Sequence, residues 1–96
     1  MTVELDCRMM TDRGTAHDYL AETFGFPNYY GRNLDALFDL LSTYEKVTQI
    51  IVNAPELLEE NLGVYGKNIL KTLEDAVREN AKLTLQINLE KNENNT

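Results

Sequence analysis

Two aspartates, Asp35 and Asp39, stand four positions apart within the segment Pro27–Tyr44, whose sequence is PNYYGRNLDALFDLLSTY. Residues at this spacing share one face of an α-helix, where two like charges repel each other and slightly lower helix stability. A pair of exposed carboxylates can accept hydrogen bonds from arginine, lysine or histidine side chains. The pattern therefore predicts an acidic surface that binds a basic partner.

The rest of the chain offers little for catalysis. His17 is the only histidine, and without a second histidine or a cysteine nearby it is predicted to pack in the core. Cys7 is predicted to be a small buried residue of a strand. The chain has no glycine-flanked serine nucleophile and no glycine-rich phosphate-binding loop. A magnesium-dependent phosphoacceptor site would need a cluster of carboxylates at the C-terminal ends of strands, and only Asp6 lies near such a position. These observations predict a protein that is not an enzyme and has no catalytic residue, metal or cofactor.

Composition narrows the class further. The 96 residues, 43% of them hydrophobic, suit one small globular domain. Nine basic and 16 acidic residues give a net charge of −7, which disfavours direct nucleic-acid binding and favours a basic protein partner. The single cysteine allows no intrachain disulfide, so a cytoplasmic location is expected. No apolar run is long enough for a membrane span, and the N-terminus lacks the apolar stretch of a signal peptide. We expect a monomer.

Hydrophobic periodicity predicts an α/β fold with a three-stranded parallel sheet and about four helices. The residues from 47 to 52 (VTQIIV) are almost continuously apolar or β-branched, which predicts a strand covered on both faces. Thr15 is predicted to cap the first helix, and Gly25 to end it. The domain should span residues 1–90, and the polar residues 91–96 should be disordered. The predicted strands are 2–8, 47–52 and 83–89, and the predicted helices are 15–24, 33–44, 55–61 and 68–80.

The predicted helix over 33–44 has one apolar stripe. Asn33 can cap its N-terminus, and Gly31 would let the preceding chain bend tightly. Phe38 lies at the border between the apolar stripe and the acidic flank, so its spacing allows either core packing or partner contact. The stripe consists of Leu34, Leu37, Leu41 and Tyr44.

Beyond these patterns, the chain resembles the barstar family of intracellular inhibitors of barnase-type ribonucleases. The resemblance covers nearly the whole chain and is most specific in Pro27, Tyr29-Tyr30-Gly31, the run from Asn33 to Leu37, and Asp39. His17 and Leu20 also match the family pattern. The resemblance implies a barstar-like fold that blocks the active-site cleft of a basic, extracellular-type ribonuclease with its second helix.

The resemblance also implies partner-binding roles for particular residues. Asp35, Asp39 and Tyr29 take the inhibitory positions, whereas Tyr30 is predicted to be structural. The fourth helix would add one acidic contact, Asp75. An ordinary solvent-exposed charge is an equally good interpretation of this residue. The full predicted set is Tyr29, Asn33, Asp35, Phe38, Asp39, Tyr44 and Asp75.

Four positions depart from the family pattern. Arg32 replaces an acidic residue, Phe38 and Tyr44 replace tryptophans, and Thr43 replaces a glycine. Arg32 weakens the local charge complementarity to a basic cleft. These departures leave an alternative open, in which the chain is a barstar-fold module or regulatory subunit that binds another basic protein without inhibiting a nuclease.

Overall fold

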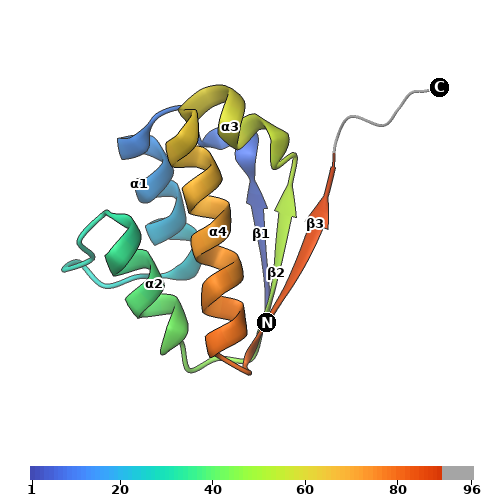
Figure 1. The fold of residues 1–96 in the computed structure, drawn as a ribbon. Helices are drawn as coiled ribbons and strands as arrows, with labels where there is room; N and C mark the ends of the chain where they lie inside the picture. The colour runs from blue at the N-terminus through green and yellow to red at the C-terminus, as the bar shows by residue number, and fades with distance from the viewer. Residues whose placement is uncertain (90–96) are drawn as a thin grey trace.

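The computed structural model describes residues 1–89 (Figure 1). It confirms the predicted class, because three strands and four α-helices alternate along the chain as expected. The predicted C-terminal tail, residues 91–96, lies outside the described residues. The elements in chain order are β1 (Thr2–Asp6), the short 3-10 helix η1 (Cys7–Met9), α1 (Arg13–Phe24), α2 (Leu34–Ser42), β2 (Thr48–Asn53), α3 (Glu56–Leu62), α4 (Val64–Glu79) and β3 (Leu83–Asn88).

The three strands form one parallel sheet in the order β1-β2-β3. The register aligns Leu5 of β1 with Val52 of β2, and Val52 with Ile87 of β3. Each crossover between neighbouring strands carries two α-helices, as parallel pairing requires. The predicted three-stranded parallel sheet is therefore confirmed.

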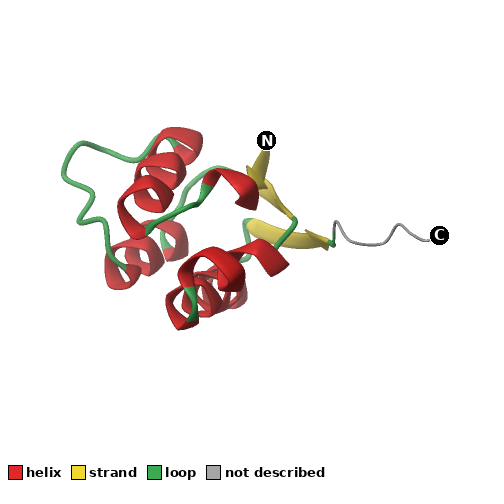
Figure 2. Ribbon diagram, turned by 90° about the horizontal axis from the view of Figure 1, so that it is seen from above, coloured by secondary structure: helices red, strands yellow, loops and turns green. Residues whose placement is uncertain are grey.

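The helices cover only one face of this sheet (Figures 1 and 2). In β2, Thr48, Ile50 and Val52 are buried beneath the helices, whereas Gln49 is exposed and Ile51 is only half-buried. The uncovered face carries polar pairs such as Gln49–Gln86 at 3.2 Å and Asn53–Glu4 at 3.3 Å. The prediction that β2 is covered on both faces was wrong. The apolar residue Ile51, which contributed to that prediction, lies on the uncovered face among polar side chains.

Helix α1 begins two residues earlier than predicted. Its N-cap is Asp12, whose Oδ1 accepts a hydrogen bond from the Thr15 backbone N–H at 2.8 Å. Thr15 is therefore not the N-cap residue. Its backbone N–H is instead the group that the Asp12 side chain caps. The C-terminal prediction is confirmed, since Gly25 ends the helix with φ 73°.

Helix α4 also begins earlier than predicted, at Val64, directly after the left-handed Gly63 that separates it from α3. The backbone of α3 crosses very close to α4 at Gly66. A Cβ atom on Gly66 would overlap the carbonyl oxygen of Leu58, so only glycine permits this crossing. Helix α4 also packs against α2, and it thereby supports the helix that carries the predicted acidic face.

Candidate functional site

A buried histidine ties together the elements around α2. His17 of α1 is 2% exposed, and its Nδ1 lies 2.6 Å from Tyr30 Oη while its Nε2 lies 2.7 Å from Tyr65 Oη. Burial, followed by the positive charge of Arg32, lowers the pKa of His17. The neutral imidazole can donate to one hydroxyl and accept from the other. His17 therefore has the packing role predicted for it, and it fixes the segment before α2 to both α1 and α4.

That segment turns into α2 through Arg32 and Asn33. The backbone of Arg32 has φ 56°, so Arg32 and not Gly31 provides the left-handed bend. Gly31 instead lies close to the first turn of α2, since a Cβ there would lie 3.2 Å from Ala36 Cβ, which is a tight contact. The predicted cap is confirmed, since Asn33 Oδ1 accepts from the Ala36 backbone N–H at 2.8 Å.

The acidic pair lies on the solvent-facing side of α2. Asp35 and Asp39 are both exposed, whereas Leu37 and Leu41 are buried in the core on the other side. Within residues 1–89, neither carboxylate belongs to any of the ion pairs of the structure. Two carboxylates about one helical turn apart are thus presented by a helix that is held rigidly by its apolar face.

The three aromatic residues of the predicted site differ in exposure. Tyr29 is 81% exposed, whereas Phe38 is half-buried against the core. Tyr44 is also half-buried, and its hydroxyl donates to the Phe24 carbonyl oxygen at 2.7 Å. Burial raises the pKa of Tyr44. Tyr29 therefore exposes most of its side chain to a possible partner, whereas Phe38 and Tyr44 expose less of theirs.

Asp75 differs from Asp35 and Asp39 because its carboxylate forms ion pairs within its own helix. Its side chain is 32% exposed and forms ion pairs within α4, with Lys71 at 3.5 Å and with Arg78. It lines a hollow of about 590 Å³ that residues of α3, α4 and the end of β3 enclose. Asp35 does not line this hollow. The charge of Asp75 is thus already balanced by its own helix, unlike the charges of Asp35 and Asp39.

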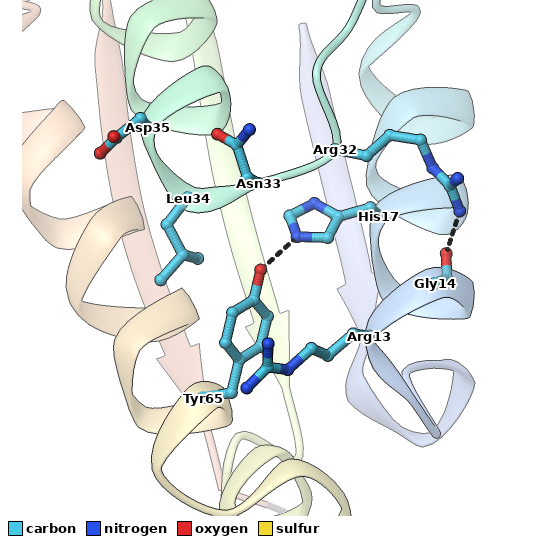
Figure 3. A pocket seen from close by; sticks show the side chains of 8 residues that line it. All are labelled: Arg13, Gly14, His17, Arg32, Asn33, Leu34, Asp35 and Tyr65. Atoms are coloured by element: carbon cyan, nitrogen blue, oxygen red, sulfur yellow. Dashed lines mark hydrogen bonds between the residues drawn. The ribbon is translucent and has the colours of Figure 1, made fainter.

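A second hollow, of about 430 Å³, opens at the N-terminus of α2 (Figure 3). The sequence analysis did not identify Arg13 and Tyr65 as members of a site. One signal was present, because Arg13 is the first residue of α1, where a cation opposes the helix dipole. The lining residues are Arg13, Gly14, His17, Arg32, Asn33, Leu34, Asp35 and Tyr65.

The described residues contain no group of three or more His, Cys, Asp or Glu side chains that could hold a metal ion. Cys7 is buried, and burial raises the pKa of its thiol to about 12, so the thiolate that would react is suppressed. Over residues 1–89, no helix has the length and apolar character needed to cross a membrane.

Two comparisons with known proteins bear on the chain as a whole. The family model described as "Barstar (barnase inhibitor)" matches residues 1–90. The chain is also 33% identical over 76 residues to the Bacillus subtilis (strain 168) protein named "Putative ribonuclease inhibitor YrdF", an alignment that covers 78% of this chain and 84% of that protein. A match across nearly the whole chain, together with the parallel sheet and the acidic α2, shows that this protein belongs to the barstar family.

Proposed function

We propose that this protein inhibits a small basic ribonuclease by placing the acidic face of α2 in the active-site cleft of the enzyme. The observation that carries the proposal is the pair Asp35 and Asp39, which are exposed and lie outside every ion pair of the described residues. Membership of the barstar family and the relative named as a ribonuclease inhibitor support the same class of function.

The physical basis is mimicry of the substrate. A ribonuclease cleft holds cationic side chains that bind RNA phosphates, and two carboxylates on one helix face can occupy the positions of two phosphates. Because the helix is already ordered by Leu37 and Leu41, binding requires little additional ordering of the backbone. The net charge of −7 would also speed the approach to a basic enzyme.

Around the acidic pair, Tyr29 supplies an exposed aromatic contact and Phe38 a partly buried one. Asn33 would act mainly by holding the start of α2, and Tyr44 by contact near its end. Asp75 joins the interface only if the partner displaces or accepts its pairing with Lys71 and Arg78. The chain would act as a cytoplasmic monomer, without binding RNA itself, against an enzyme of the extracellular type.

The test is an inhibition assay with barnase as the probe, because the family description names that enzyme. RNA cleavage should fall as the purified protein is added. Asp39→Ala should weaken inhibition at least about a hundredfold, because it leaves desolvated cations of the enzyme without a partner. Glu60→Ala, which removes one exposed carboxylate from α3, is the matched control and should change little.

The outcomes separate the two candidate functions. Inhibition that depends on Asp39 but not on Glu60 supports the proposal. Failure to inhibit barnase or any other small basic ribonuclease, by a protein whose circular dichroism is native, would overturn it. That result would favour a barstar-fold module that binds a different basic protein.

A further inference from the structure

Two arginines line the 430 Å³ hollow beside α2, on a chain that is otherwise acidic (Figure 3). Arg13 comes from the first turn of α1 and Arg32 from the loop before α2. Asp35, one of the two carboxylates of the acidic face, lines the same hollow. This basic corner, defined as Arg13 and Arg32, is therefore continuous with the surface that the proposed function assigns to the ribonuclease.

Arg13 is held in place without a carboxylate. Its Cζ lies 4.0 Å from the centre of the Tyr65 ring, a cation–π contact that holds the guanidinium over that ring. Tyr65 is fixed in turn by the hydrogen bond to His17 Nε2 at 2.7 Å. Across residues 1–89, no ion pair of the structure includes Arg13. The guanidinium of Arg13 is therefore held by an aromatic ring, and no carboxylate among residues 1–89 is paired with it.

Arg32 is oriented by two contacts that use a single nitrogen. Its Nη2 donates to Gly14 O at 3.1 Å and lies 2.9 Å from Asp18 Oδ1. A guanidinium carries five N–H donors in a planar fork, so most of them lie outside these two contacts. The side chain of Asp18 is 70% exposed. A solvent-exposed ion pair of this kind contributes little binding energy, so another anion can replace Asp18 as the partner of Arg32.

The charges of the two arginines extend into the hollow. Burial is the main cause that lowers the pKa of His17, and the positive charges of Arg32 and Arg13 lower it further, against the opposing charge of Asp18. The backbone N–H groups at the start of α2 add positive potential at the same place. Two positively charged side chains thus lie at the edge of an acidic surface.

We propose that the basic corner receives one aspartate or glutamate side chain of the ribonuclease, an inference that rests on the proposed function. The two oxygens of a carboxylate match the parallel donors of a guanidinium, and two arginines can bind one carboxylate from two sides. An RNA or other polyanion fits less well, because Asp35 lines the hollow and the chain carries a net charge of −7.

The consequence is a recognition surface that binds both positively and negatively charged side chains of the enzyme. Asp35 and Asp39 select the cations of a ribonuclease cleft, and the basic corner selects enzymes with an acidic residue at the rim of that cleft. An enzyme without that residue would bury two cations against its own positive field and would be rejected. Arg13 and Arg32 therefore determine which ribonuclease is inhibited.

The experiment has two stages. In the first, the protein is tested against barnase and other small basic ribonucleases by residual RNA cleavage, and the most tightly inhibited enzyme is chosen. In the second, dissociation constants for that enzyme are measured with wild type, Arg13→Gln, Arg32→Gln and the double variant. Lys67→Gln is the matched control, because it removes one exposed positive charge on α4 that lies outside the basic corner.

Each arginine substitution should weaken binding about tenfold, the effect of losing one charged hydrogen-bonded contact. The effect should vanish when one particular acidic residue of the enzyme is replaced by alanine, whereas Lys67→Gln should bind no more weakly than wild type. Tighter binding by the arginine variants, or equal losses against every acidic substitution in the enzyme, would overturn the inference while leaving the proposed function intact. Inhibition of no enzyme in the first stage would instead overturn the proposed function, and this inference with it.

Discussion

The imidazole of His17 lies 2.6 Å from the hydroxyl of Tyr30, and this contact joins the first helix to the loop that leads into the acidic helix. Tyr30 is 7% exposed and its ring lies 4.8 Å from that of Phe26. The adjacent Tyr29 points into solvent. The loop thus holds Tyr30 inward and leaves Tyr29 exposed to solvent.

Removing the Tyr30 hydroxyl should weaken this arrangement. In Tyr30→Phe, a nitrogen of the buried imidazole loses its partner, which should lower the free energy of unfolding by about 1–3 kcal/mol. Urea denaturation followed by circular dichroism measures the change. Tyr29→Phe is the control, because its hydroxyl is in water. Equal stability of the two variants would show that the contact between His17 and Tyr30 does not hold the loop.

The stability of the protein should depend on pH through His17. Burial lowers its pKa in the folded state below the usual value of 6.5, so the unfolded chain binds a proton first as the pH falls. Stability should therefore be complete above about pH 7 and decline as the pH drops below 6.5 towards the folded-state pKa. His17 is the only histidine, so this decline can be assigned to it.

The measurement is urea denaturation of wild type and His17→Gln at a series of pH values from 5.5 to 7.5. The variant should be less stable at pH 7.5, but its stability should change less over this range. A wild-type stability that rises as the pH falls from 7 to 5.5 would contradict the assignment of His17 as a neutral buried group.

Much of the fold could be predicted from the sequence because the informative patterns are local. The apolar stripe of α2 and the Gly25 stop of α1 depend on residues within a few positions of one another. The acidic pair was predicted for the same reason, since Asp35 and Asp39 are separated by only one helical turn. The structure places both on the exposed face of α2, as the spacing indicated.

The features that the sequence did not predict depend on tertiary packing. The uncovered face of β2 follows from all four helices lying on one side of the sheet, which the composition of β2 alone cannot indicate. The basic corner depends on Arg13 meeting Tyr65, which is 52 positions away along the chain. The left-handed backbone lies at Arg32, next to Gly31, where the sequence predicted only a tight bend.

Asn33 should act on the fold as well as on binding. Its side chain caps α2 through the Ala36 N–H at 2.8 Å, so Asn33→Ala should lower the free energy of unfolding by about 1 kcal/mol. Asn33→Asp can make the same contact and should retain wild-type stability. Thermal unfolding of the two variants, with the exposed Asn28→Ala as control, measures the difference. Equal losses for Ala and Asp at this position would show that the cap contributes nothing.

Association with a ribonuclease should be steered by charge. The net charge of −7 and the exposed pair on α2 attract a basic enzyme over distances that salt screens, since the Debye length falls from about 30 Å at 0.01 M to about 3 Å at 1 M ionic strength. The association rate constant with barnase should therefore fall steeply across this range, whereas the dissociation rate should change less. Stopped-flow mixing at several salt concentrations measures both rates.

Two carboxylate variants distinguish local steering from net charge. Asp35→Asn and Glu60→Asn each remove one negative charge, but only Asp35 lies on the proposed interface. Asp35→Asn should lower the salt dependence of association more than Glu60→Asn does, because the steering field is strongest where the two surfaces meet. An association rate that is insensitive to salt, with both variants behaving as wild type, would mean that docking is driven by apolar contact. The acidic face of α2 would then not be the surface that meets the enzyme first.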